Sequence, residues 1–422
     1  MASEKATISS VDEAAKLSAE QAIIAYCSGT FSVGGIMVAK DGTIVKQMHN
    51  AVIVDGFPHD PTAHGERQMV DWYYQQIYGG VMLPPPEDLT IVTSLDPCCM
   101  CTGAILTAGF RAVTVAEDNT SGINFDSSDT FNTLPSVLRP QAKATFSYPA
   151  IGGETCFARP SKGASILFPV GDGVIDDQTA ALCEVIFDDT LQTVRDDINH
   201  DLPPDKLKNI ADLPEDNYIR KAVSDVDERA LQYEFHGEAQ PRDQVAFANA
   251  MADTMRQDHA NGGPGEAIAL IDPFDNFLFM TSGALNVSKI MTAFMILTRG
   301  YAKLRYTLHQ AHQADPDQYP EDPLEYLAHP KYCRFLTALS PNESSQSYMG
   351  LGAYGSTMEG PFDTVKQYQY AVPRISQSAI DAITQGMPPL YSQIIKVKLS
   401  EIEGVGFFRQ IIQDTWISLG GG

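Results

Sequence analysis

One histidine, one glutamate and two cysteines in the first quarter of the chain have types and spacings that suit metal chemistry. One residue separates His64 from Glu66, and two separate Cys98 from Cys101. Imidazole and thiolate are preferred zinc ligands, and three of them leave the fourth tetrahedral position open to water. Zinc with an open position lowers the pKa of bound water to about 7. Glu66 is placed to accept the proton of that water and to return it to a leaving group.

The three closely spaced cysteines of the segment DPCCMC (residues 96–101) have two simpler explanations. A buried cysteine is often only a small apolar residue, and a C-x-x-C pair can be a redox pair. Neither explains the upstream His64 and Glu66, so zinc binding is our preferred interpretation. Cys99 lies between the two ligands, and we expect its side chain to point away from them into packing.

The surrounding elements are expected to bring these residues together. Apolar residues at helical spacing follow His64, and the segment after Cys98 predicts a second helix, with Cys98 and Cys101 on one face of its first turn. The helix dipole favours thiolates at that end. Further helices, strands and a hairpin give the order αββαβαβ, which is typical of a three-layer α/β/α sandwich around a mixed sheet. The predicted ranges are residues 13–29 (helix), 34–50 (hairpin turning at 40–42), 88–95 (strand) and 111–118 (strand).

The pattern H-x-E followed by P-C-x-x-C is the motif of zinc-dependent deaminases. The segments DPTAHGE (residues 60–66) and SLDPCCMCTGAIL (residues 94–106) resemble motifs of the cytidine deaminase-like superfamily, in its branch of bacterial guanine deaminases and tRNA adenosine deaminases. The resemblance covers roughly residues 10–130. It departs at Gly65, where the family usually has alanine, and at Asp96, where it has glutamate; neither change touches a ligand.

The resemblance implies a Zn²⁺-dependent aminohydrolase that contains the sandwich fold, with Glu66 as its catalytic residue. It also implies that Asn50 contacts the base, with Thr62 and Ala63 beside it. The backbone amide of Cys99 would steady the oxygen of the tetrahedral intermediate. The ordinary explanation of Asn50, at the end of a strand, is a turn residue. The loop that follows Asn50 is longer than usual in the family, so we expect the pocket wall to differ.

The substrate is less well defined by these residues. A guanine-type free purine is favoured, while a pyrimidine nucleoside or the wobble adenosine of a tRNA remains open. The net charge of −24 repels a phosphate backbone and counts against a nucleic-acid substrate. The alternative is a protein without catalytic activity: a nucleotide-binding scaffold in which zinc only stabilises the fold. Glu66 favours the enzyme, because a structural zinc site does not need it.

The element order recurs from about residue 240, which predicts a second copy of the fold. Residues 242–259 and 286–304 are expected to be helices, and residues 266–283 a hairpin turning at 273–276. The motif T-x-L-x-P at residues 337–341 matches the same motif at 93–97.

The second copy has lost the predicted metal ligands. The motif alignment places Asn342 and Ser345 at the two cysteine positions. Val287 and Lys289 are expected near the positions of the histidine and the glutamate. Hydroxyl and amide groups are poor zinc ligands.

We therefore predict a zinc-dependent deaminase domain over residues 1–230, with an extension after about residue 130, and a degenerate deaminase-like domain over residues 231–422. The charged residues 196–230 are expected to be a connector with short helices. Residues 130–195 lie outside the resemblance and are where substrate selection is expected to be encoded. Pairing of the two halves within one chain would replace the subunit pairing common in this superfamily; a homo-oligomer remains open.

Composition places the chain among globular proteins. Its seven cysteines cannot all pair within one chain and form no evenly spaced framework, so reduced thiols are expected. No apolar run approaches the roughly 20 residues that span a bilayer, and the first residues lack a basic region followed by an apolar one. We therefore expect a cytoplasmic protein without a membrane segment.

Overall fold

Two five-stranded mixed sheets, one in each half of the chain, form the centre of the computed structural model. The structure describes residues 6–125, 130–152, 173–197, 202–236, 240–357, 367–394 and 398–421. The first sheet has the strand order β2 (Ile44–His49), β1 (Gly34–Ala39), β5 (Leu89–Leu95), β6 (Arg111–Ala116) and β7 (Phe146–Ser147). The second has the order β11 (Phe277–Thr281), β10 (Ile268–Ile271), β12 (Arg334–Leu339), β13 (Gln367–Val372) and β14 (Lys398–Glu401).

The two sheets share one topology. In each, the first two strand pairings are antiparallel and the last two are parallel. The hairpins turn at Gly42 and at Asp275, which both have positive φ, as the sequence predicts for residues 40–42 and 273–276. The repeated order and directions confirm two copies of an α/β/α fold with a mixed sheet.

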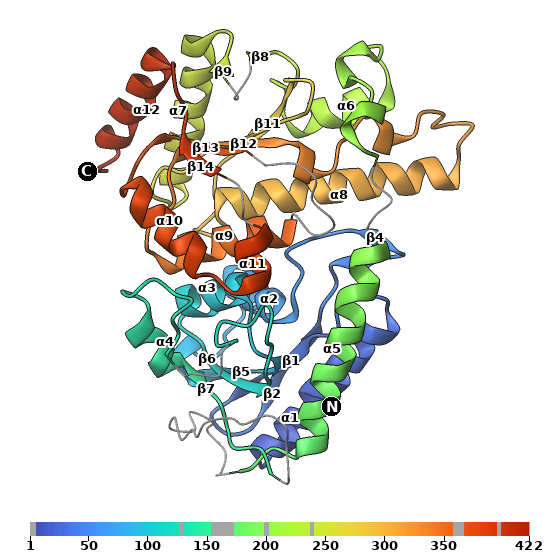
Figure 1. Cartoon of the computed structure of the whole chain (residues 1–422), viewed down its shortest axis with the longest axis vertical. Helices are drawn as coiled ribbons and strands as arrows, with labels where there is room; N and C mark the ends of the chain where they lie inside the picture. The colour runs from blue at the N-terminus through green and yellow to red at the C-terminus, as the bar shows by residue number, and fades with distance from the viewer. Residues whose placement is uncertain are drawn as a thin grey trace.

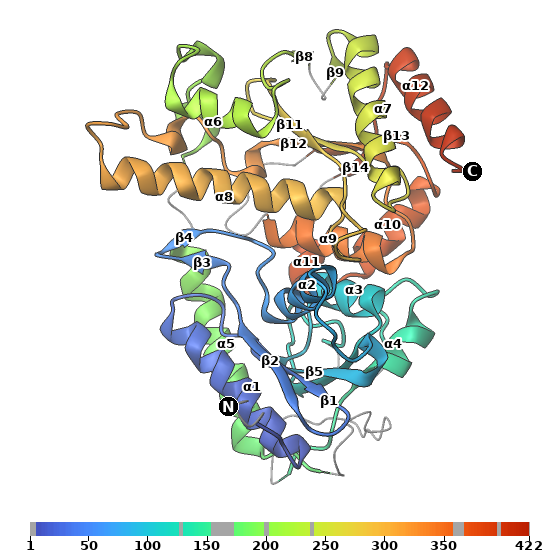
Figure 2. The same ribbon diagram turned by 180° about the vertical axis from the view of Figure 1, so that it is seen from behind.

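Helices cover both faces of each sheet. In the first half, α1 and α5 pack on one face, and α2 and α3 lie on the other (Figure 2). In the second half, α7 and α12 pack together on one face, and α8 and α9 lie on the other. The helices of the first half are α1 (Val11–Cys27), α2 (Gly65–Tyr78), α3 (Cys99–Ala108), α4 (Arg139–Thr145) and α5 (Asp177–Asp197). Those of the second are α7 (Gln244–Ala260), α8 (Ala293–Ala314), α9 (Ser345–Thr357), α10 (Gln377–Gly386), α11 (Pro389–Ile394) and α12 (Gly406–Ser418).

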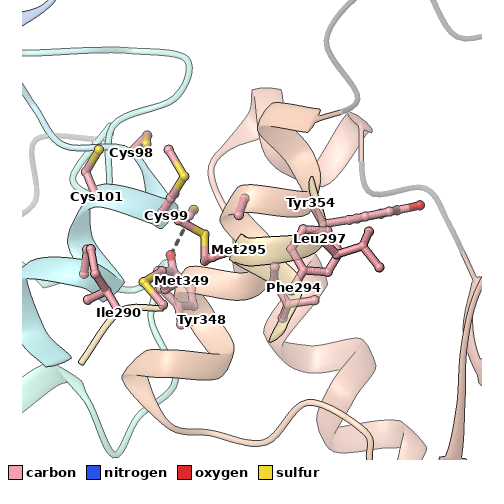
Figure 3. Close-up of a cluster of buried hydrophobic side chains, with 14 of the residues drawn as sticks. Cys98, Cys99, Cys101, Ile290, Phe294, Met295, Leu297, Tyr348, Met349 and Tyr354 are labelled. Atoms are coloured by element: carbon pink, nitrogen blue, oxygen red, sulfur yellow. Dashed lines mark hydrogen bonds between the residues drawn. The ribbon is translucent and has the colours of Figure 1, made fainter. Parts of the chain in front are cut away.

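The inner helix layers of the two halves pack against each other (Figure 1). The closest crossing joins α3 to α9, where glycines let the backbones approach. A Cβ added to Gly103 would lie 2.6 Å from Cβ of Met349, and one added to Gly352 would lie 2.3 Å from the backbone nitrogen of Met100. One cluster of buried apolar side chains therefore runs from the first half into the second, as Figure 3 shows around these helices.

Residues 202–230 lie against the second half. This segment contains the short helices η3 (Pro204–Lys206), η4 (Ile210–Asp212) and α6 (Tyr218–Val226), and α6 contacts α8 and β11. The carboxylate of Asp227 accepts a hydrogen bond from the backbone of Met280 in β11. The domain boundary near residue 230 stays a prediction.

One predicted element begins later than expected. Residues 286–292 precede α8, which starts at Ala293 with Thr292 as its N-cap. Because α2 has His64 at its N-cap, Thr292 occupies the position of the histidine, and Phe294 occupies that of Glu66. The register that placed Val287 and Lys289 there is wrong, because a loop rather than a helix connects β11 to Thr292.

The second motif alignment also shifts. Helix α3 begins two residues after Pro97, whereas α9 begins four residues after Pro341. By helix position, Ser347 in α9 therefore corresponds to Cys101, in place of the predicted Ser345. The six described cysteines are free thiols, and Cys156 lies outside the described residues. No helix among the described residues has the length and apolar character needed to cross a membrane.

Candidate metal centre and pocket

Two helix starts position the candidate ligands. His64 is the N-cap of α2 and Cys98 is the N-cap of α3, while Cys101 follows in the first turn of α3. The segment before His64 is fixed by Asp60, whose Oδ1 accepts hydrogen bonds from the backbone nitrogen of Thr62 at 2.8 Å and from its hydroxyl at 2.6 Å. The imidazole is thereby held beside the thiols.

The three side chains converge as the sequence predicts. The ligand atoms of His64, Cys98 and Cys101 all lie within 4.8 Å of one another, and this is the one such group found among the described residues. Nδ1 of His64 is 3.4 Å from Sγ of Cys98. Tetrahedral zinc with ordinary bond lengths would separate a nitrogen and a sulfur ligand by roughly 3.5 Å. The donor set and its spacing therefore fit zinc, with a fourth position open.

The electrostatics of the thiols also fit a cation. Burial raises the pKa of Cys98, but its hydrogen bond with Cys101 and the nearby His64 outweigh burial and hold that pKa well below the usual value. Burial and the neighbouring Cys98 raise the pKa of Cys101 well above the usual value. Two adjacent thiolates repel each other, so a divalent cation is the natural means of holding both deprotonated.

Glu66 lies beside the cluster. Its Oε2 accepts a hydrogen bond from Sγ of Cys101 at 3.4 Å, and its Oε1 lies 2.9 Å from the hydroxyl of Thr93 in β5. The side chain is 2% exposed, and this burial, together with the charge of Cys98, raises the pKa of Glu66. A carboxylate of raised pKa at this point is suited to moving protons near neutral pH.

A cavity open to solvent, with about 470 Å³ of space when that solvent is included, reaches the cluster. His64, Glu66 and Cys98 lie in its wall together with Leu390 and Tyr391 of α11, and the side chain of Tyr391 is hydrogen-bonded to Cys98. Helix α11 belongs to the second half and reaches over the helix layer of the first (Figure 1). The backbone nitrogen of Leu390 fixes this contact by donating to the carbonyl of Thr120 at 2.9 Å. The second half thus completes the pocket of the first.

Of the four predicted substrate contacts, Asn50 lines the cavity. Its Oδ1 accepts hydrogen bonds from the Thr30 hydroxyl at 2.7 Å and from the backbone nitrogen of Val52 at 2.9 Å. Because protein groups occupy Oδ1, the amide nitrogen Nδ2 is the group that Asn50 can offer to a ligand.

The other three predicted contacts are not among the residues that line the cavity. The hydroxyl of Thr62 bonds to Asp60, and the side chain of Ala63 is buried. Cys99 points across the contact between the halves, with its Sγ 3.2 Å from the hydroxyl of Tyr348 (Figure 3). The packing predicted for the Cys99 side chain is confirmed, while the substrate roles of Thr62, Ala63 and the Cys99 amide stay predictions.

Sequence reasoning missed several pocket residues. Phe187 and Leu191 of α5 line the cavity, and they come from the extension after residue 130. Residues 153–172 of that extension lie outside the described residues. Asp118 also lines the cavity, two residues after the end of β6. Leu390 and Tyr391 have no local pattern that could have indicated their place.

Comparisons with known proteins agree with this geometry. Residues 8–117 match the family model of the cytidine and deoxycytidylate deaminase zinc-binding region. The chain is 35% identical over 101 residues to the cytosine deaminase of Candida albicans, a match that spans 24% of this chain and 61% of that protein. The chain thus covers less than two thirds of that relative.

Two guanine deaminases are also similar. The chain is 31% identical over 116 residues to the guanine deaminase of Bacillus subtilis, a match that spans 26% of this chain and 70% of that protein. The solved structure of the guanine deaminase from Nitrosomonas europaea is 15% identical, with a TM-score of 0.26, over 44% of this chain and 88% of that one. The chain belongs to the family defined by the cytidine and deoxycytidylate deaminase zinc-binding region, and the cluster of His64, Cys98 and Cys101 lies inside that region.

Proposed function

We propose that the protein hydrolytically deaminates an amino-substituted free nucleobase, with guanine the first substrate to test. One observation carries the proposal. His64 and Cys98 of the three-ligand cluster line the same cavity as Glu66, whose carboxylate is not needed to hold the metal. A zinc ion that only stabilised the fold would need neither the open fourth position nor the carboxylate.

The chemistry exchanges an amino group for an oxygen. Zinc, when bound by the three ligands, supplies an activated water at neutral pH. Glu66 relays the two protons of the attacking water one after the other, the first to a ring nitrogen and the second to the departing amino group. The water oxygen becomes the ring carbonyl, and the amino group leaves as ammonia. Thr93 fixes one carboxylate oxygen, so the other stays turned toward the cluster.

Two further groups are proposed to hold the substrate. Nδ2 of Asn50 donates a hydrogen bond to an acceptor atom of the base. The backbone N–H of Cys99, in the first turn of α3, donates to the oxygen on the carbon under attack.

A free base is favoured over a polynucleotide. Leu390 and Tyr391 close one side of the cavity, and Phe187 lines another. The net charge of −24 also disfavours a phosphate backbone. The relatives in the comparison include a guanine deaminase and a cytosine deaminase, so guanine and cytosine form the core of the substrate panel.

The test measures ammonia release by the zinc-loaded protein from guanine, cytosine, adenine, the corresponding nucleosides and tRNA. We expect release from guanine or cytosine. Glu66→Gln should lower kcat by about 10²- to 10⁴-fold, the usual contribution of a general acid–base group, while the zinc content stays at one ion per chain. Unchanged turnover in Glu66→Gln would overturn the assigned role, and release from tRNA alone would overturn the choice of a free base.

A further inference from the structure

The second half contains a cavity at the place that corresponds to the metal pocket of the first. Both cavities are open to solvent, and the space inside them, solvent included, is about 460 Å³ here and 470 Å³ in the metal pocket. Strand register establishes the correspondence, because Gly35 pairs with Thr93 in the first sheet and Ile268 pairs with Thr337 in the second. The hydroxyls of Thr93 and Thr337 both reach the carbonyl two residues later, and Thr337 lines the second cavity.

This second cavity has lost the groups that bind metal and move protons. Thr292 stands at the position of His64, and Phe294 stands at that of Glu66. Ser347, in the first turn of α9, takes the place of a thiol. A hydroxyl is a poor zinc ligand, and a phenyl ring carries no proton. A ligand in this cavity would therefore be bound without being deaminated.

Two charged side chains remain in the cavity wall. Arg374 follows β13 by two residues, as Asp118 follows β6 in the first half. Nη2 of Arg374 lies 3.3 Å from Oε1 of Glu266 and 3.3 Å from Oγ of Ser347. Both distances are at the long end for hydrogen bonds. Nε of Arg374 also donates to the carbonyl oxygen of Ser340 at 2.5 Å, so the guanidinium is anchored while its Nη2 meets Glu266 and Ser347 only at long range. The two charged side chains are only 12% and 26% exposed, so a ligand that bonds to them would offset part of their desolvation.

The chemistry of the wall defines a class of ligand. Glu266 offers an acceptor directly beside the donor groups of Arg374, and a lactam edge presents the complementary pair, a ring N–H next to a carbonyl. The rings of Phe294 and Tyr368, with centroids 5.9 Å apart, line the same cavity and supply an apolar surface for a flat ring.

We propose that this cavity binds a planar heterocycle with a lactam edge, such as an oxopurine or a uracil-type base, and leaves it unchanged. Glu266 accepts the ring N–H, and Arg374 donates to the neighbouring carbonyl. Deamination converts an amino-substituted edge into a lactam edge, so the ligand class includes the products of the proposed reaction. The binding site itself does not depend on that activity.

Gly350 provides a sharp test of this site. It lines the cavity from α9, and a Cβ added there meets nothing within 4 Å. The Cβ of Gly350→Leu therefore meets no clash, and the rest of the leucine side chain adds bulk to the cavity wall. Gly300→Leu is the matched control, because Gly300 also lies in a helix with open space around it but is exposed and away from the cavity. Glu266→Gln removes the acceptor charge and nearly keeps the shape.

The experiment titrates uracil and hypoxanthine into the full-length zinc-loaded Glu66→Gln protein by calorimetry. The other substitutions are made in this Glu66→Gln protein. We expect Gly300→Leu to leave the affinity and stoichiometry for uracil and hypoxanthine unchanged. Gly350→Leu and Glu266→Gln should each remove one bound base per chain or weaken its binding at least tenfold. 1,3-Dimethyluracil, which keeps both carbonyls but has no N–H, should not occupy the site.

Equal stoichiometry and affinity in all variants, or equally tight binding of 1,3-dimethyluracil, would overturn the proposal. Binding that survives in Gly350→Leu belongs to the metal pocket. If no base releases ammonia while the Gly350-dependent binding is present, the proposed deaminase activity fails and this site stands.

Discussion

Among single side chains, the Thr93 hydroxyl links the carboxylate of Glu66 to strand β5. Its Oγ1 lies 2.9 Å from Oε1 of Glu66 and 3.1 Å from the carbonyl of Leu95. A hydroxyl has one proton, so Thr93 can donate to only one of these acceptors at a time. This contact orients the group on which the proposed proton transfers depend.

We therefore predict that Thr93→Val lowers kcat while zinc content stays at one ion per chain. Hydrogen bonds to charged groups are worth about 1.5–3 kcal/mol, which corresponds to a loss of about 10- to 100-fold. Steady-state kinetics and metal analysis measure the two quantities. A variant with normal kcat would show that the carboxylate needs no such support.

Thr337 offers a matched control for this substitution. Its hydroxyl donates to the carbonyl of Leu339 at 2.8 Å, but its half of the chain has phenylalanine where the first half has Glu66. Thr337→Val should cost about 1 kcal/mol of unfolding free energy, as expected for one lost hydrogen bond, and leave kcat unchanged.

The metal cluster could be predicted from sequence because its ligands lie in two short motifs whose spacing fixes their geometry. His64 and Cys98 stand at helix starts, and local periodicity is enough to place them there. The part of the pocket wall that the second half supplies could not be predicted in this way. Leu390 and Tyr391 are almost 300 residues distant in sequence, and only the packing of the two halves brings them to the metal cluster.

Among the helices, the crossing of α3 and α9 joins the two halves at the element that carries the thiols. Gly352 faces the backbone at Met100, and Gly103 faces Met349. Any side chain at either glycine would push the helices apart. Because α3 also holds Cys98 and Cys101, a displacement of this crossing would reach the metal site.

We predict that Gly352→Ala destabilises the protein and weakens zinc binding. Overpacking costs about 1–3 kcal/mol, which outweighs the roughly 1 kcal/mol that alanine gains over glycine in a helix. Gly300→Ala, at an exposed helical position with open space, should instead stabilise by up to about 1 kcal/mol. Denaturant unfolding and a chelator competition assay provide the comparison, and equal behaviour of the two variants would contradict the prediction.

Two helices of the second half were predicted from sequence, at residues 242–259 and 286–304, but the start of the second was placed too early. The apolar spacing from residue 286 onward resembles a helix, yet α8 begins only at Ala293, where the Thr292 hydroxyl accepts a hydrogen bond from the backbone nitrogen of Met295. The spacing of apolar residues indicates which face of a helix is buried, but it does not show whether the helix starts one or two turns earlier or later. The cap that decides the start, Thr292, lies inside the otherwise apolar run of residues 290–297.

Across the whole molecule, Arg299 ties the second half to the segment that presents His64. This residue of α8 pairs with Asp60 at 3.2 Å and with Asp71 at 2.8 Å, both in the first half. The buried Arg67 pairs with the same two carboxylates. Asp60 in turn holds the turn before the imidazole, so one ion-pair network spans the contact between the halves and the edge of the metal site.

We predict that Arg299→Met lowers the free energy of unfolding by about 1–2 kcal/mol, less than for a fully buried pair because Arg299 is partly exposed. Arg256→Met, which breaks an exposed pair with Asp253 on the surface of α7, should change it little. Thermal and denaturant unfolding of the two variants measure the difference.

The Arg299 effect should depend on pH. Burial alone would raise the pKa of Asp60, but Arg67, Arg299 and the hydrogen bonds from Thr62 outweigh it and lower that pKa below 3.8. A lowered pKa in the folded state stabilises above pH 3.8, and this stabilisation is lost as the pH falls through the folded-state value. The difference in unfolding free energy between wild type and Arg299→Met should therefore be largest near neutral pH and become smaller below pH 3.8. A difference that does not change with pH would contradict the assignment of this effect to the Asp60 carboxylate.

Because Tyr391 and the metal ligands belong to one polypeptide, the pocket wall cannot be lost by dissociation. In an assembly of separate subunits, diluting the sample would remove a wall of this kind from a growing fraction of the molecules. Covalent linkage instead fixes the local concentration of α11 at the pocket. Turnover per molecule therefore does not depend on the concentration of the protein in the cell.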